Sequence, residues 1–396
     1  MIRGLQGVEV LVGEGESSQD WYSQYHRFGE IVRRTKELAA NHPEIAEFVP
    51  SIGKSVEGRH IPVIHITGPQ LGQKGPDGKK AKVSSAKNTG KPQIWMNGGQ
   101  HAREWIAPAA VMYMTEHLLK GYKSNDPKIK HLLDKFEFVV APVINPDGYE
   151  YSHTGNRLWR KNRRKNADGT YGVDLNRNWD NHWGEGGAST RPSATDYQGP
   201  SVASEPEVRA CQNYILKEMK HRVAGIDFHS YGDMILRSKG WTSKASRDES
   251  MLRKMGADMR ASIKHAKKGE HSVYKSEMAA GLYPTTGSTD DLMSEQGKMW
   301  GHGWTVELPD SDKGGHGFLL PASQILPAST EVHKGLLSFL GDISKEHDKR
   351  ERMGAEEWRK EVADESMALA TKELDEADLT AHLAALGAEL EAHELA

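Results

Sequence analysis

Short apolar segments alternate with amphipathic segments along most of this 396-residue chain, and this alternation restricts the fold more than any other feature. Residues 136–143 and 223–228 are almost continuously apolar, which is typical of strands buried on both faces. Segments with helical periodicity, such as 106–119 and 329–343, lie between and after the strands. Strands that alternate with helices of about 10–15 residues predict an α/β fold with helices on both sides of one sheet.

The same periodicity predicts further elements. Strands are predicted at 48–52, 61–66, 93–96 and 304–306, and helices at 21–41 and 205–219. The only cysteine, Cys211, lies in the last of these helices, so it predicts a buried thiol, and it can form no internal disulfide.

Composition divides the chain into a central domain, residues 19–344, and two flanking segments. Residues 1–18 are polar and Gly-rich, with a short strand predicted at 8–12. Residues 68–90 are rich in Lys, Gly and Ser, which predicts an exposed loop insertion. Residues 345–396 are acidic and rich in Ala, Glu and Leu, which predicts a helical tail that either folds back on the domain or binds an unknown partner.

Charge and hydropathy exclude several classes of partner. A net charge of -3 gives no electrostatic basis for binding nucleic acid or a membrane surface. No apolar stretch is long enough to span a bilayer, and the N-terminus does not resemble a signal peptide. We expect a monomer.

Three segments place metal-binding or acidic side chains beside predicted strands. His101 and Glu104 follow the strand at 93–96 and two glycines, and His229 ends the strand at 223–228. Two imidazoles and one carboxylate suit zinc with one open position, although His101 and Glu104 alone could equally form a surface ion pair. Glu307 stands in an apolar strand, where it is either a general base beside the metal or a residue at a solvent-facing edge.

Eight segments resemble the zinc metallocarboxypeptidases of the pancreatic A/B type, in order and in spacing. The resemblance extends from about residue 20 to residue 343 and implies a mixed eight-stranded twisted sheet with helices on both faces. The segments are HAREW (101–105), NPDGY (145–149), NRLWRK (156–161), GVDLNRNWD (172–180), HSYGD (229–233), LYPTTGSTDD (282–291), TVEL (305–308) and GFLLPASQILP (317–327).

The resemblance also implies the function: one Zn²⁺ per chain and hydrolysis of the C-terminal bond of peptides and proteins by an activated water. It implies an extracellular enzyme and a cis peptide between Ser230 and Tyr231, and it allows residues 1–18 to be the remnant of a prodomain. The implied roles are zinc binding for His101, Glu104 and His229, general base for Glu307, oxyanion stabilisation for Arg160, support of His101 for Asp174, and substrate binding for Arg103, Asn176, Arg177 and Tyr283.

The side-chain preference rests on Asp290, which takes the position that determines specificity in the family. A buried carboxylate favours a substrate Lys or Arg at the C-terminus. Lys239 could neutralise Asp290, and the bulky Met278 could narrow the pocket, so the sequence also allows an aliphatic, aromatic or broad preference. The resemblance is compatible, too, with a catalytically inactive peptide-binding relative and with a related amidohydrolase.

Overall fold

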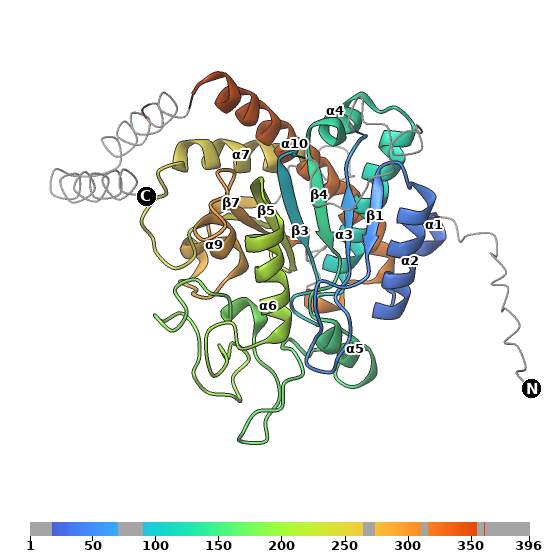
Figure 1. The fold of residues 1–396 in the computed structure, drawn as a ribbon. Coiled ribbons are helices and arrows are strands. Elements are labelled where there is room, and N and C mark those ends of the chain that lie inside the picture. The colour runs from blue at the N-terminus through green and yellow to red at the C-terminus, as the bar shows by residue number, and fades with distance from the viewer. Residues whose placement is uncertain (1–17, 70–89, 264–273, 310–315, 355–359, 361–396) are drawn as a thin grey trace, which may run out of the picture.

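Eight strands form one mixed sheet in the order β1-β2-β4-β3-β5-β8-β6-β7, which confirms the predicted architecture (Figure 1). The computed structural model describes residues 18–69, 90–263, 274–309, 316–354 and 360. Four central strands, β4, β3, β5 and β8, run parallel, so their carboxyl ends meet at one edge of the sheet. The strands are β1 (Ala46–Val49), β2 (Val63–Ile66), β3 (Gln93–Asn97), β4 (Glu137–Ala141), β5 (Arg222–Ser230), β6 (Met234–Arg237), β7 (Lys275–Met278) and β8 (Gly303–Leu308).

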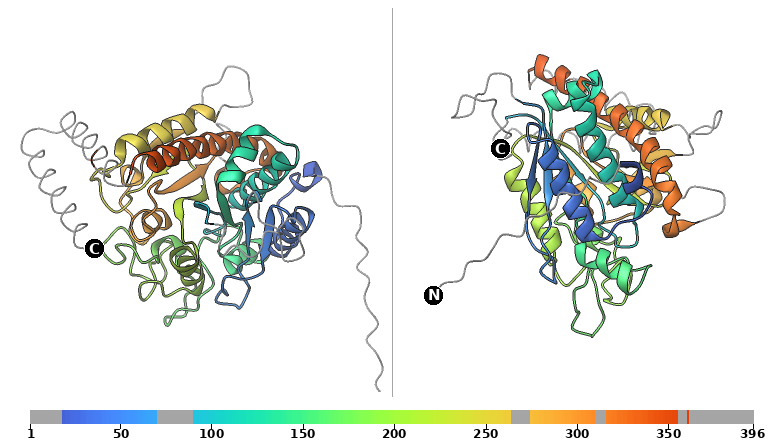
Figure 2. Two further views of the ribbon diagram at one scale, coloured as in Figure 1. Left: turned by 45° about the horizontal axis from the view of Figure 1, so that its top comes forward. Right: turned by 90° about the vertical axis from the view of Figure 1, so that its right-hand side faces the viewer.

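Helices cover both faces of the sheet, as predicted. One face packs against α2, α3, α7 and α10, and the other against α6 and α9, which gives two separate apolar cores (Figure 2). The helices are α1 (Ser18–Trp21), α2 (Phe28–Asn41), α3 (Ile106–Lys123), α4 (Pro127–Lys135), α5 (Pro146–Thr154), α6 (Pro206–Asn213), α7 (Glu249–Ser262), α8 (Ala279–Leu282), α9 (Thr289–Ser294) and α10 (Ile325–Arg352), with short turns η1 (Leu175–Arg177), η2 (Tyr214–Glu218), η3 (Gly317–Leu319) and η4 (Ala322–Gln324).

The helix predicted over 21–41 is wrong in its first turns. Helix α1 ends at Trp21 and α2 begins at Phe28. The backbone at Arg27 is extended, and its amide donates to Glu30 Oε2 at 2.8 Å, so the Glu30 side chain caps the start of α2. The helical spacing of apolar residues continues through the segment between α1 and α2. The cap at the start of α2 nevertheless ends one helix and begins another.

Two other predicted elements differ in their bounds. The strand predicted at 48–52 ends at Val49, because Pro50 follows and has no amide hydrogen to donate to the sheet. The helix predicted at 205–219 is α-helical only to Asn213 and continues as a π-helical turn to Glu218. Cys211 is fully buried, as predicted, and this burial raises the pKa of its thiol.

Helix α10 crosses the domain limit that we predict at residue 344 and continues to Arg352. Its last turns pack on the domain: Lys135 Nζ donates to the Ser344 carbonyl at 2.9 Å, and the Arg350 guanidinium lies 4.3 Å from the centre of the Trp300 ring. Most of residues 1–18, 68–90 and 345–396 lie outside the described residues, as does the strand predicted at 8–12. Within the described residues, no helix is long and apolar enough to cross a membrane.

Candidate active site

Parallel strands deliver the predicted metal-binding group to one edge of the sheet. His101 and Glu104 lie in the loop after β3, and His229 is the second-last residue of β5. The turn after β3 needs glycine at Gly99, where φ is 62° and an added Cβ would lie 3.1 Å from Pro108 and Val143. The loop therefore bends sharply enough to bring His101 back over the strand ends.

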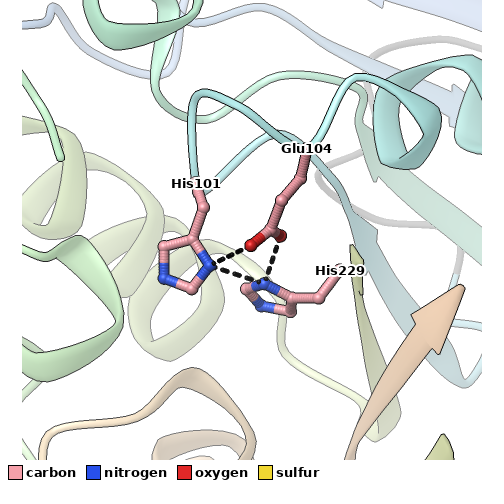
Figure 3. A group of neighbouring side chains, drawn as sticks. All are labelled: His101, Glu104 and His229. Atoms are coloured by element: carbon pink, nitrogen blue, oxygen red, sulfur yellow. Dashed lines mark hydrogen bonds and ion pairs between the residues drawn. The ribbon is translucent and has the colours of Figure 1, made fainter. Parts of the chain in front are cut away.

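The three side chains converge on one point (Figure 3). Glu104 Oε1 lies 2.9 Å from His101 Nδ1, and Glu104 Oε2 lies 3.0 Å from His229 Nδ1. The two Nδ1 atoms are themselves 3.0 Å apart. All three side chains are buried, and although burial raises it, the pKa of Glu104 is held well below its usual range by His101 and His229.

The surroundings of the two histidines fit a metal ion. Asp174 Oδ1 lies 3.1 Å from His101 Nε2, and Asp227 Oδ2 lies 2.8 Å from His229 Nε2. Each carboxylate accepts the hydrogen on Nε2 of its own histidine. The Nδ1 atom of that histidine therefore keeps its lone pair, which can bind a metal ion. Two lone pairs and a carboxylate that face one another need a cation between them, and this donor set suits zinc.

Arg160 lies beside this group, as predicted. Its Nε and Nη2 atoms donate to Asp174 Oδ2 at 3.0 and 2.8 Å, and Nη1 lies 3.9 Å from Glu104 Oε1. Although burial raises it, the pKa of Asp174 is held well below its usual range by Arg160 and His101. Asp174 therefore stays ionised and orients His101 and Arg160 together.

Glu307 lies directly across from His229 in the pairing of β5 with β8. The residue as a whole is partly exposed, but its Oε2 atom is buried and has no hydrogen-bond partner among the described residues. Burial of the carboxyl raises the pKa of Glu307 to about 8. The interpretation of β8 as a solvent-facing edge strand is wrong, because β8 has β5 on one side and β6 on the other.

Arg177 is buried, with 5% of its surface exposed. Its Nη1 donates to the Asn176 carbonyl at 2.6 Å, whereas its Nε has no partner, and no ion pair joins it to a carboxylate in the described part of the chain. The side-chain Oδ1 of Asn176 accepts from Thr289 N at 3.0 Å. A buried guanidinium that forms no direct ion pair is costly, so this position favours an anionic ligand.

The structure also describes the other residues that the sequence predicts for the substrate site. Tyr283 follows α8 and is 53% exposed, and the Arg103 guanidinium lies 3.8 Å from the centre of the Phe318 ring. Asp290 is buried in the first turn of α9, and burial raises its pKa. The peptide between Ser230 and Tyr231 is cis, as predicted.

Sequence patterns alone did not identify Asp227 or Arg157. Asp227 lies two residues before His229 on the same face of β5, and this period-two spacing is the signal that could have revealed it. Arg157 stacks 3.6 Å above the Trp105 ring and donates to the Arg103 carbonyl at 2.7 Å, so it supports the loop that holds Glu104. Nothing in the sequence distinguishes Arg157 from the arginines around it.

Two histidines and a glutamate at the carboxyl ends of parallel strands, with Glu307 paired across from His229 and Arg160 beside Glu104, define a metal-dependent hydrolase. The family model described as zinc carboxypeptidase matches residues 31–335. The chain therefore belongs to the zinc carboxypeptidase family, and it is a metallocarboxypeptidase whose cofactor is zinc.

Known carboxypeptidases are similar to most of this chain in sequence and in structure. A carboxypeptidase B of Astacus astacus is 34% identical over 80% of this chain and 96% of the relative. Carboxypeptidase A1 of Bos taurus is 32% identical over 81% of this chain and 70% of the relative. The structure of bovine thrombin-activatable fibrinolysis inhibitor in complex with tick carboxypeptidase inhibitor superposes with a TM-score of 0.70 at 29% identity, covering 82% of this chain and 99% of that chain.

Proposed function

We propose that this enzyme removes single residues from free peptide C-termini, with Arg177 and Asn176 binding the terminal carboxylate. The observation that supports this most strongly is the buried guanidinium of Arg177, which has no carboxylate partner within the described residues. A peptide carboxylate supplies the missing anion and can pair with a guanidinium through two parallel hydrogen bonds. Binding at that point sets the register, so that only the last peptide bond reaches the metal group.

The proposed chemistry divides among three side chains and the metal. Zinc held by His101, Glu104 and His229 supplies Lewis acidity and a more acidic water. Glu307 accepts a proton from the attacking water and donates it to the leaving amine. This role fits its Oε2 atom, which has no hydrogen-bond partner in the described part of the chain. Arg160, anchored by Asp174, stabilises the negative charge that develops on the carbonyl oxygen.

Three further residues complete the proposed substrate site. Tyr283 closes over the terminal residue, which its exposed position allows. Arg103 contacts the peptide further upstream.

We also propose that Asp290 gives a preference for C-terminal Lys or Arg. Relatives named carboxypeptidase B and carboxypeptidase A1 are 34% and 32% identical to this chain, so the comparisons do not decide this preference.

The surroundings of Asp290 support a basic substrate. No ion pair joins Lys239 to Asp290, and the Lys239 ammonium instead lies 5.6 Å from the centre of the Trp241 ring. Asp291, next in the chain, accepts from the Gly240 amide at 2.9 Å, so its carboxylate is held by the backbone. Asp290 therefore has no cation of its own among the described residues, and a substrate Lys or Arg would provide one.

Asp290→Ile is expected to lower kcat/KM for peptides that end in Arg by about 10–100-fold and to leave peptides that end in Leu within about threefold, because the charge at the pocket is lost. The measurement is kcat/KM for peptides that end in Arg, Lys, Leu and Phe. Lys239→Ala is the control and should change the Arg-to-Leu ratio little. A wild type that prefers Phe to Arg, with Arg hydrolysis unchanged in Asp290→Ile, would refute the role of Asp290.

Arg177→Ala is expected to raise KM for free-acid peptides by about 10–100-fold, because charge-assisted hydrogen bonds to the terminal carboxylate are lost. The preference for free acids over C-terminal amides should shrink in the same proportion. The comparison is made on matched acid and amide peptides, with the exposed Arg191→Ala as the control. Equal discrimination by Arg177→Ala and the wild type would show that the carboxylate binds elsewhere.

A catalytic domain that corresponds to the predicted residues 19–344, extended by α10 to Arg352, and an extracellular location are part of this proposal. Hydrolysis of a free-acid peptide by the zinc-loaded protein would exclude an inactive binding relative. Hydrolysis of other amides in preference to peptide C-termini would instead favour the related amidohydrolase.

A further inference from the structure

His182 lies between two carboxylates that come from different parts of the chain. Its Nδ1 atom is 2.7 Å from Glu185 Oε2, and its Nε2 atom is 3.2 Å from Glu295 Oε2. Glu185 is in the same loop, whereas Glu295 caps the C-terminal end of α9. A neutral imidazole has only one N–H group, so both contacts can be hydrogen bonds only when His182 is protonated.

The same imidazole stacks on Trp241. The ring centres are 3.7 Å apart and the planes differ by 20°. Trp241 Nε1 donates to Glu295 Oε1 at 2.8 Å, and the Trp241 amide donates to Asp291 at 3.1 Å. His182 therefore joins its own loop to α9 and to the segment after β6, and a protonated ring gains from the indole face.

This loop also contacts the segment that contains Tyr283. The Gly287 amide donates to the Asn181 carbonyl at 2.8 Å, and the Trp179 amide donates to the Gly287 carbonyl at 3.1 Å. Thr286 Oγ1 donates to the Gly186 carbonyl. Residues 179–187 thus connect Arg177, which precedes them, with the turn that follows Tyr283.

We propose that His182 is a positioning residue for substrate binding. It holds residues 179–187 against Glu295 and Trp241, and thereby keeps Arg177 and the Tyr283 segment at the distance that the terminal residue of a peptide requires. This inference rests on the binding roles proposed above for Arg177 and Tyr283. His182 itself does not touch the reacting atoms.

The inference predicts an effect of the side chain at position 182. The charged groups that face His182 are Glu185 from its own loop and Glu295 from α9, and Lys239 lies on the Trp241 ring. A side chain that cannot stack on Trp241 and reach both carboxylates would hold the loop less firmly.

The test compares KM and kcat for a free-acid peptide in the wild type, His182→Gln and His182→Arg. His182→Gln should raise KM about fivefold with kcat within about twofold, as expected for partly exposed polar contacts. His182→Arg keeps the planar stack and two donors, and should stay within about twofold of the wild type in both KM and kcat.

Controls separate this inference from the proposed function. His131→Gln, on α4, removes an exposed histidine whose Nε2 atom contacts Ser344 Oγ, and it should leave KM unchanged. If His182→Gln does not fold, Glu185→Gln decides, because Glu185 is 61% exposed and its replacement should raise KM in the same direction. An unchanged KM in His182→Gln, or in Glu185→Gln where that variant decides, or a His182→Arg variant as weak as His182→Gln, would overturn the inference. A wild type that does not cleave free-acid peptides would instead overturn the proposed function.

Discussion

Glu307→Gln is expected to lower kcat by at least about 100-fold while zinc remains bound, because a carboxamide cannot accept the proton of the attacking water. Glu307 is not one of the three converging side chains, so its replacement leaves all donors of the metal group in place. Glutamine has nearly the same shape, and Oε2 of Glu307 has no hydrogen bond to lose within the described residues. The fold should therefore be unaffected.

The measurement combines steady-state kinetics with the zinc content of the purified variant. Glu351→Gln, an exposed position at the end of α10, is the matched control and should retain wild-type kcat. A Glu307→Gln enzyme with full zinc and wild-type kcat would mean that another residue is the base. A variant without zinc would mean that Glu307 contributes to metal binding.

Removal of zinc with a chelator is expected to abolish hydrolysis, and added Zn²⁺ should restore it. The donors are two imidazole nitrogens and one carboxylate, whereas Mg²⁺ and Ca²⁺ prefer oxygen ligands, so neither should restore activity. The metal binds the folded chain, so the melting temperature should fall when zinc is removed and recover when it returns.

Metal content, melting temperature and turnover are measured on the same samples. His101→Ala is the companion variant and should show low zinc content and a melting temperature that no longer responds to Zn²⁺. Full activity after exhaustive dialysis against the chelator would refute the metal assignment. Rescue of activity by Mg²⁺ alone would refute the preference that we derive from the donor set.

Local sequence patterns were sufficient for the elements that contain the site. The glycine pair before His101, the three-residue spacing to Glu104 and the apolar strand that ends at His229 all predicted positions that the structure confirms. Where a local contact interrupts the period, the prediction failed, as it did at the Glu30 cap before α2. Periodicity records which face is apolar, but it does not record where a side chain caps a helix.

The sequence by itself determined the α/β class, most of the central strands and the residue types of the metal group, but it did not predict β6 or β7 and left open whether Glu307 faces the metal or solvent. Only the tertiary structure decided that β5 lies between β3 and β8, which places His229 beside both Glu104 and Glu307. It also decided that Arg177 is buried without a direct ion pair among the described residues and that His182 meets Glu295 across 113 residues. The physical reason is that burial and ion pairing depend on which distant segments pack together, whereas periodicity and turn chemistry depend only on near neighbours in the chain.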